Sequence, residues 1–376
     1  MLKRFSVTGF KNFEDTITID FSDVKDYRFH PECVTDGLIN TAIIYGKNAV
    51  GKTNFGLAML DIISHLTNNN VTPGLYDYYI NVNNERGIAA FEYVFQFGAD
   101  EVVYGYRKSE KDELESETLK LNGRELLVVS YGLDIYNTTY DNKGLIDLAP
   151  NLSWGAFWDF GTNGSALKYF LFNSSLDPRH PLSKMQRFVS NMLWYRALDE
   201  NRFIGYRDKS NDYYTFLFKR PEYMAEFNEL LKQSGIDESV VAKKDTDSET
   251  RLYFDTVPPL PFHKVASNGT KALCAFFYWF KTTPDISLMY IDEFDAYYHY
   301  ELSETIVTML EKIGGFQKIL TSHNTNLLSN RIMRPDCYFI LTKDRLISLA
   351  NATGRELREG HNLEKLYMGG EFNGQN

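Results

Sequence analysis

Residues 43–54 read I-I-Y-G-K-N-A-V-G-K-T-N, and this stretch decides the fold. An apolar run at 41–45 ends at Gly46, and a helix-compatible segment begins just after Thr53. Between them lies the pattern G-x-x-x-x-G-K-T, with Gly46, Gly51, Lys52 and Thr53 in register. This is the phosphate-binding loop in the strand–loop–helix context that it requires. A glycine turn with an unrelated lysine is the alternative, and this context argues against it.

The loop pattern implies a specific chemistry. Backbone N–H groups must turn inward around a polyphosphate, so glycine is needed where a Cβ would block the turn. The positive end of the following helix faces the phosphates, Lys52 reaches the β- and γ-phosphates, and the Thr53 hydroxyl binds Mg²⁺. We expect nucleotide contacts from the whole loop, which comprises Gly46, Lys47, Asn48, Ala49, Val50, Gly51, Lys52, Thr53 and Asn54.

Length and composition indicate a large globular protein. The chain has 376 residues and 43% apolar content, which suits one domain with a sizeable insertion or two lobes. Three scattered cysteines, Cys33, Cys274 and Cys337, lack metal-ligand spacing and suit a reducing compartment. The opening M-L-K-R-F-S-V has no apolar signal region, and no apolar run approaches membrane-spanning length. We therefore expect a soluble, cytoplasmic protein with no membrane partner.

The net charge of −10 does not favour nucleic acid over the whole molecule. One segment, 179–220, is nevertheless rich in basic residues. It is either a surface for nucleic acid or an acidic partner, or an ordinary solvated face. The basic residues concerned are Lys184, Arg187, Arg196, Arg202, Arg207, Lys209 and Lys219.

Three blocks follow one another along the chain. Block 1–130 contains two antiparallel strands within 2–21, the loop strand, a helix over 57–66, and a β-meander from 90 to 129 with a hairpin signal at Asn122-Gly123. Block 131–250 shows helical periods at Leu182–Ala197 and Tyr223–Lys232 and ends in a polar hinge, Thr246–Glu249. It predicts an inserted, mainly helical subdomain that packs through its apolar stripes.

Block 251–376 returns to strand–helix alternation. It predicts strands at 251–257, 287–291, 317–321, 337–342 and 345–349, with helices at 269–280 and 300–313. Short apolar strands that alternate with helices, attached to a phosphate loop, imply a mostly parallel, RecA-like α/β sheet.

Two polar groups close apolar strands in this block. Asp292 and Glu293 end the strand L-M-Y-I. Beside a phosphate loop, Asp292 would hold Mg²⁺, and Glu293 would orient and deprotonate the attacking water. His323, in T-S-H-N, ends the next strand and can hydrogen-bond the γ-phosphate and the attacking water. Solvated carboxylates and a structural histidine are the alternatives.

The segment V-A-S-N-G-T-K starts a helix just before the Asp-Glu strand. Ser267 is a good helix N-cap, and capping is the simplest explanation. The same geometry, with Gly269 leaving the backbone open, also makes an anion site.

Five stretches in this order resemble the head of an ABC-class ATPase. They are F-S-V-T-G-F-K-N-F at 5–13, G-K-N-A-V-G-K-T-N at 46–54, S-N-G-T-K at 267–271, L-M-Y-I-D-E-F-D-A-Y-Y-H at 288–299, and T-S-H-N at 321–324. The opening, with Lys11 and Asn12, is similar to SMC, RecF and OLD-like ATPases. The carboxyl end resembles AAA-type ATP-binding proteins of the OLD-like branch, which are found in bacterial phage-defence operons.

The resemblance implies the fold of an ABC ATPase head with an N-terminal antiparallel β-meander and an inserted helical subdomain. It implies ATP and Mg²⁺ as cofactors, nucleotide contacts from Lys11 and Asn12, and two heads that dimerise head to tail around two ATPs. Ser267 and Gly269 would then contact the γ-phosphate of the partner, and His323 would be the switch histidine.

Several positions depart from the family pattern. The signature is S-N-G-T rather than S-G-G-Q, and His299 stands where many ABC enzymes have aspartate. The glutamine of the Q-loop is not identified, although Gln96 is a candidate. After 341 the chain is too short for the TOPRIM nuclease domain of OLD proteins, and T-K-D-R at 342–345 lacks the pattern that reads guanine.

Two functions from different classes are consistent with these features. The first is an ATP-dependent switch that forms a homodimer or higher homo-oligomer and controls a separate nuclease or toxin in antiviral defence. The second is a RecF- or SMC-like DNA-repair or maintenance ATPase that binds DNA itself. A transporter ATPase fits poorly with the inserted block and the amino-terminal strands.

Overall fold

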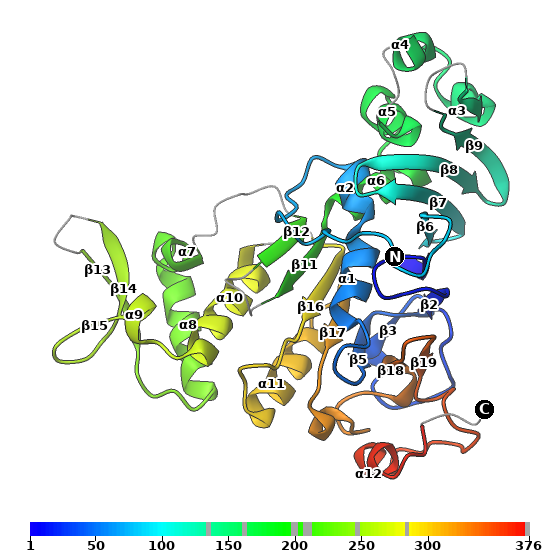
Figure 1. Ribbon diagram of the computed structural model, residues 1–376. Coiled ribbons are helices and arrows are strands. Elements are labelled where there is room, and N and C mark those ends of the chain that lie inside the picture. The colour runs from blue at the N-terminus through cyan, green and yellow to red at the C-terminus, as the bar shows by residue number, and fades with distance from the viewer. Residues whose placement is uncertain are drawn as a thin grey trace.

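The computed structural model describes residues 1–132, 137–159, 164–196, 202–205, 213–244, 249–282 and 286–372. Two seven-stranded sheets organise these residues (Figure 1). One is the expected, mostly parallel sheet, and the other is the expected antiparallel meander. The strand predicted at 251–257 does not join the parallel sheet, because β14 (Thr250–Phe254) pairs in a separate three-stranded sheet. Arg207, Lys209 and three residues of the expected hinge at 246–249 lie outside the described residues.

The central sheet has the strand order β12-β11-β16-β17-β5-β18-β19. Its five inner strands run parallel, and β12 and β19 pair antiparallel at the two edges. The strands are β5 (Thr41–Tyr45), β11 (Met192–Arg196), β12 (Arg202–Gly205), β16 (Leu288–Asp292), β17 (Gln317–Thr321), β18 (Tyr338–Leu341) and β19 (Leu346–Ser348). Every residue of β5, β16 and β17 is buried, which explains the largely apolar sequences of β5 and β16; β17 also buries the polar Gln317, Lys318 and Thr321.

The second sheet is a meander with the order β10-β9-β8-β7-β6-β1-β2, in which each pair is antiparallel. It consists of β1 (Leu2–Thr8), β2 (Ile17–Asp20), β6 (Ala89–Phe97), β7 (Asp100–Glu110), β8 (Glu113–Leu121), β9 (Arg124–Ser130) and β10 (Thr139–Asp141). The hairpin signal at Asn122-Gly123 is confirmed, because both residues adopt positive φ between β8 and β9.

Helix α1 (Lys52–Leu60) connects the phosphate loop to the core. A Cβ at Gly56 would lie 2.5 Å from the Tyr290 ring of β16 and 2.8 Å from Trp194 Nε1 of β11. Glycine therefore lets α1 lie directly on these two strands. The expected helix 57–66 is in fact the end of α1 and a separate short helix, α2 (Ile62–Leu66), which are joined at Asp61.

Two groups of helices lie at opposite ends of the molecule. In Figure 1, α3 (Lys143–Leu148), α4 (Trp154–Asp159) and α5 (Ala166–Asn173) lie beyond the meander, whereas α7 (Tyr213–Lys219), α8 (Pro221–Gln233) and α10 (Asn268–Thr282) form a lobe at the opposite end. This lobe also carries α9 (Phe262–Val265) and a small sheet of β13 (Val240–Lys244), β14 (Thr250–Phe254) and β15 (Leu260–Pro261). Near the carboxyl end are α11 (Tyr300–Glu311) and α12 (Leu363–Met368), and β3 (Val34–Thr35) pairs with β4 (Leu38–Ile39).

The expected helix at Leu182–Ala197 is wrong in its second half. Helix α6 (Pro181–Ser190) ends, and after Asn191 the chain enters β11. Residues 192–195 are buried and pair with β12 on one side and β16 on the other, so sheet pairing overrides the helical period. Block 131–250 is therefore not a continuous helical insertion, because it supplies two strands to the central sheet.

Candidate functional site

The phosphate loop leaves the carboxyl end of β5 in the middle of the central sheet. A Cβ at Gly46 would lie 2.7 Å from the Leu341 carbonyl oxygen. Gly51 has φ +104°, and a Cβ there would meet the Asn12 side chain at 2.4 Å. Both glycines are thus required by close approach, as the loop pattern predicts. Lys47, Asn48 and Ala49 form the exposed tip, and Val50 is buried.

Lys52 is buried within the loop. Its ammonium donates to the carbonyl of Gly46 at 2.9 Å and of Lys47 at 3.4 Å. Among the described residues no carboxylate lies within ion-pair distance of it. Burial lowers the pKa of Lys52, and the carboxylates of Glu293, Asp292 and Asp295 act in the opposite direction. A buried ammonium held only by carbonyl oxygens is suited to receive an anion.

Asp292 ends β16 two strands away from β5, with β17 between them. Its fully buried carboxylate accepts hydrogen bonds from the Thr53 hydroxyl at 2.8 Å and the Thr321 hydroxyl at 3.0 Å. Burial raises the pKa of Asp292, and these two donors and Arg196 oppose that shift. The adjacent oxygens of Thr53 and Asp292 are hard ligands of the kind that Mg²⁺ prefers, so they fit the predicted metal.

Glu293 occupies an unusual backbone position directly after the strand. Its φ is +50°, a left-handed conformation that costs a non-glycine residue on the order of 1–3 kcal/mol. The Glu293 N–H donates to Thr321 Oγ1 at 2.7 Å, which helps to hold this turn. Such strain is characteristic of functional positions, and here it follows the buried Asp292.

Arg196 is the site residue that sequence reasoning placed elsewhere. Its Nη2 donates to Glu293 Oε2 at 2.7 Å, and its Nε lies 3.5 Å from Asp292 Oδ2. Arg196 ends β11, which pairs with β16 so that Arg196 is opposite Asp292. In the sequence, Arg196 is one of the basic residues of segment 179–220, which is expected to be either a partner-binding surface or a solvated face. The parallel β11–β16 register, which no local pattern reveals, brings it to the carboxylates instead.

The other described basic residues of the segment differ in their contacts and exposure. Arg179 pairs with Asp177, and the guanidinium of Arg220 lies 5.2 Å from the centre of the Tyr223 ring. Arg187 and Arg202 are exposed, and Lys184 is half-buried. The side chain of Lys219 is also outside the described part of the chain. The structure thus places Arg196 at the candidate site and not on a basic surface.

His323 follows β17 and is exposed. Burial of part of the ring and the nearby Lys52 charge lower the pKa of His323, whereas Glu293 raises it. The ring therefore stands within electrostatic range of both the loop lysine and the carboxylate. Asp295, the other acid of this turn, accepts a hydrogen bond from the Ser322 hydroxyl at 2.5 Å. Both acids are therefore hydrogen-bonded, Asp295 by Ser322 and Glu293 by Arg196. Glu293 stays the predicted general base because it directly follows Asp292.

Lys11 and Asn12 reach the loop from the amino-terminal hairpin. Asn12 donates to the Val50 carbonyl at 2.9 Å and accepts from the Asn54 amide at 2.7 Å. The Lys11 ammonium donates to the Asp77 carbonyl at 2.5 Å. These residues line a hollow of about 680 Å³ beside the loop, together with Glu14, Asp15, Ala49, Asp77, Tyr78, Ile80, Asn81, Val82, Asn83, Lys343 and Asp344.

Ser267 and Gly269 lie at the start of α10. The Ser267 hydroxyl accepts from the Thr270 N–H at 3.1 Å and bonds the Thr270 hydroxyl at 2.8 Å, as an N-cap does. A Cβ at Gly269 would lie 2.8 Å from the Tyr297 carbonyl oxygen, so α10 packs on the turn that follows Glu293. The Ser267 hydroxyl is exposed and does not bond the phosphate loop of its own chain.

Gln96, the candidate for the Q-loop, lies away from this site. Its side-chain amide donates to the carbonyls of Gly98 and Asp100 at 2.7 and 3.2 Å and closes the turn between β6 and β7. This role is structural.

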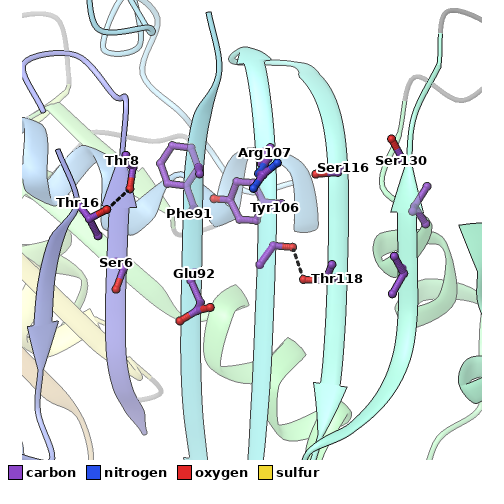
Figure 2. Close-up of a pocket in the computed structure, with 14 residues that line it drawn as sticks. Ser6, Thr8, Thr16, Phe91, Glu92, Tyr106, Arg107, Ser116, Thr118 and Ser130 are labelled. Atoms are coloured by element: carbon purple, nitrogen blue, oxygen red, sulfur yellow. Dashed lines mark hydrogen bonds between the residues drawn. The ribbon is translucent and has the colours of Figure 1, made fainter. Parts of the chain in front are cut away.

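A second hollow, of about 660 Å³, lies on the meander (Figure 2). Figure 2 shows hydroxyl side chains from adjacent strands on it, including Thr8 and Thr16, whose hydroxyls bond each other at 2.8 Å. Its charged residues are one acid, Glu92, and one base, Arg107. This balance gives no preference for an anionic ligand, so the phosphate loop remains the better candidate for nucleotide.

A family model described as "AAA domain, putative AbiEii toxin, Type IV TA system" matches residues 42–329. The chain belongs to this AAA-domain family. The match covers the loop, Asp292, Glu293 and His323, and so spans more than half of the sequence. It confirms the resemblance to AAA-type ATP-binding proteins of the ABC class.

Solved structures of SMC heads are similar to the chain. The SMC head bound to the C-winged helix domain of ScpA has 14% identity and a TM-score of 0.44, covering 92% of this chain and 97% of that chain. The SMC head domain from Thermotoga maritima has 14% identity and a TM-score of 0.42, covering 92% and 98%. The SMC head domain with an extended coiled coil, bound to the C-terminal domain of ScpA derived from Pyrococcus furiosus, has 13% identity and a TM-score of 0.42. The match covers 92% of this chain and 96% of that chain. No curated protein matches the sequence.

Within the described ranges, no helix combines the length and apolar character needed to cross a membrane.

Proposed function

We propose that this protein is an ABC-class ATPase that binds and hydrolyses MgATP and acts as a switch for a separate effector. The buried Lys52 ammonium carries the proposal, since it sits in a complete phosphate loop and faces no carboxylate at ion-pair distance among the described residues. A triphosphate would supply the missing anion.

The surrounding residues fit the steps of hydrolysis. Thr53 and Asp292 would hold Mg²⁺, which offsets phosphate charge when bound. Glu293 would accept a proton from the attacking water, and His323 would hydrogen-bond the γ-phosphate and that water. The hollow that begins at Lys11, Asn12 and Asn54 would take the nucleoside, because it adjoins the loop.

Ser267 and Gly269 support a dimer. The exposed Ser267 hydroxyl stands at the start of a 15-residue helix and does not reach the phosphate loop of its own chain. We propose that a second copy presents this helix start to the bound γ-phosphate, giving a homodimer or higher homo-oligomer with two composite sites.

The effector proposal rests on the family description. That description names a putative AbiEii toxin of a type IV toxin–antitoxin system, and this supports a role in defence. The antiviral target, the separate nuclease or toxin and the cytoplasmic location are part of our proposal. Direct DNA binding by this chain has less support, because two basic residues of 179–220 are paired with acids of the chain, Arg179 with Asp177 and Arg196 with Asp292 and Glu293.

Lys52→Ala tests the proposal directly. We expect the variant to lose measurable MgATP binding in calorimetry and to release no phosphate, because the loop loses its buried cation. Lys120→Ala removes an exposed lysine of the meander and serves as the matched control, with binding unchanged. MgATP affinity in folded Lys52→Ala equal to that of the unaltered protein would refute the site assignment.

A further inference from the structure

A second group of metal-type ligands lies away from the phosphate loop. One ring nitrogen of His30 and one carboxylate oxygen each from Glu32 and Glu311 all lie within 4.8 Å of one another. His30 precedes the turn Pro31–Cys33, Glu32 lies within that turn, and Glu311 ends α11, almost 300 residues later in the chain. The fold therefore brings three metal-type ligand residues, one of them distant in the sequence, close together.

The tautomer of His30 indicates which nitrogen is free to bind a cation. Its Nε2 lies 3.0 Å from the carbonyl oxygen of Asn330, which can only accept. Nε2 must therefore carry a proton, and in the neutral ring Nδ1 presents a lone pair. That lone pair lies 3.1 Å from Glu32 Oε1, which is also an acceptor. Two acceptors at this distance require either a proton or a metal ion between them.

The Glu311 carboxylate is also poorly compensated, and it is buried. The residue is 6% exposed, and its carboxylate accepts one hydrogen bond, from the Cys33 thiol at 3.3 Å, which is a weak donor. No described cation forms an ion pair with it. Two bases, His30 and more weakly Lys318, act on Glu311 electrostatically, and Lys318 donates its ammonium to the Ile313 carbonyl. A buried carboxylate with so little compensation is costly.

We propose that His30 Nδ1, Glu32 and Glu311 bind a divalent transition-metal ion, with Zn²⁺ as the preferred class. One imidazole and two carboxylates match the mixed nitrogen and oxygen ligands of such ions, and two carboxylates neutralise the charge of a divalent cation. The Asn330 carbonyl that fixes the His30 ring is the outer partner that metal-binding histidines usually have.

A metal ion at this site would link the amino-terminal segment to α11. Glu311 ends α11, which begins seven residues after Glu293. The ion would therefore hold the end of α11 that is farther from the proposed general base. This site is independent of nucleotide binding, since none of its ligands contacts the phosphate loop among the described residues.

Calorimetric titration of the metal-free full chain with Zn²⁺, in excess Mg²⁺, tests the proposal. We expect one site per chain that is lost or weakened at least about tenfold in His30→Gln, Glu32→Gln and Glu311→Gln. Glu301→Gln and His263→Gln alter an exposed acid and an exposed histidine elsewhere and are the matched controls. Zn²⁺ should also raise the Tm of the unaltered protein by a few degrees, and not that of Glu311→Gln.

Glu32 keeps the test decisive if the buried substitution impairs folding, because its side chain is 43% exposed and can be changed without disturbing the core. Zn²⁺ binding that is unchanged in Glu32→Gln and His30→Gln would overturn the proposal. Absence of any Zn²⁺ binding or Tm shift in the unaltered protein would do the same and would favour a protonated His30. MgATP binding should be normal in Glu32→Gln, so this outcome is separable from the nucleotide proposal.

Discussion

At the scale of single residues, the catalytic turn combines one engaged acid and one that is positioned for chemistry. Asp292 is held by Thr53 and Thr321 on the strand side. Glu293 points its carboxylate to Arg196 and sits at a strained φ. Asp295 is bonded to Ser322 in the same way, so the proposal of Glu293 as the base rests on its place directly after Asp292.

Glu293→Gln should bind MgATP normally and hydrolyse it at least about a hundredfold more slowly. The amide preserves the shape of the side chain but cannot accept the proton. Phosphate release at saturating ATP measures the effect, and calorimetry confirms binding. Turnover equal to that of the unaltered protein would move the base to another carboxylate, with Asp295 the first to examine.

Arg196→Gln should lower turnover about tenfold or more with little change in MgATP affinity. The guanidinium contacts Glu293 and Asp292 together, and its loss leaves the Glu293 carboxylate without an orienting partner. Arg196→Lys should recover only part of the rate, because an ammonium cannot span both carboxylates as a planar fork does. A raised KM with unchanged kcat would instead mean that Arg196 binds the nucleotide.

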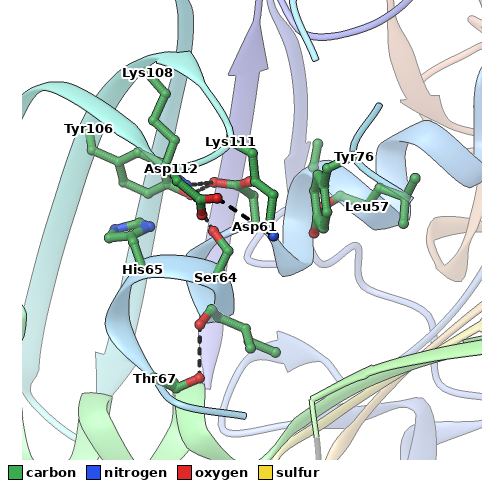
Figure 3. A network of polar contacts seen from close by, with 12 residues as sticks. Leu57, Asp61, Ser64, His65, Thr67, Tyr76, Tyr106, Lys108, Lys111 and Asp112 are labelled. Carbon is green, nitrogen blue, oxygen red and sulfur yellow. Dashed lines mark hydrogen bonds and ion pairs between the residues drawn. The ribbon is translucent and has the colours of Figure 1, made fainter. Parts of the chain in front are cut away.

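At the scale of elements, the helix that carries the loop is fastened to both sheets. Gly56 lets α1 lie on β16 and β11, and the Tyr290 hydroxyl donates to the Lys52 carbonyl at 2.8 Å. At the far end, Asp61 and Lys108 form a fully buried ion pair at 2.7 Å between α1 and β7, and Figure 3 shows it among tyrosine and serine side chains. Lys108 also donates to Ser64, and Tyr106 donates to Asp61.

Lys108→Met should destabilise the protein by about 3–5 kcal/mol, because it leaves Asp61 as an uncompensated buried charge. Denaturant unfolding measures the loss. Lys111→Met is the matched control; its 3.8 Å pair with Asp112 is exposed, so the change should cost at most about 1 kcal/mol. Adding Asp61→Asn to Lys108→Met should recover part of the loss. Equal, small effects of Lys108→Met and Lys111→Met would contradict this account of the buried pair.

Elements whose signals are local could be predicted from the sequence. The loop, the Asp292-Glu293 strand end and the meander were predictable because turn glycines, apolar runs and alternation lie within a few residues of each other. The strand at Met192–Arg196 was not, because M-L-W-Y continues the helical period of α6 and becomes a strand only through its neighbours in space. The same non-local pairing hid Arg196, and the convergence of His30 with Glu311 has no sequence spacing at all.

At the scale of the whole molecule, the question is whether one chain contains a complete ATPase site. The loop, Asp292, Glu293 and His323 converge within the chain, whereas the helix start at Ser267 stays bonded to Thr270. If Ser267 is only an N-cap, Ser267→Arg should cost about 0.5–2 kcal/mol of stability and leave hydrolysis per folded molecule unchanged.

If a second copy uses Ser267, the same substitution places a bulky side chain in the dimer interface. We expect MgATP binding to each monomer to stay near normal, because residues 46–54 are untouched, and ATP-dependent dimerisation and hydrolysis to fall. Light scattering and phosphate release measure these two effects. Mixing Ser267→Arg with Lys52→Ala should then restore part of the activity. In the mixed dimer, the unaltered Lys52 of one chain meets the unaltered Ser267 of the other, so one of the two composite sites is intact. If mixed dimers form and remain as inactive as either parent, Ser267 does not act across the interface.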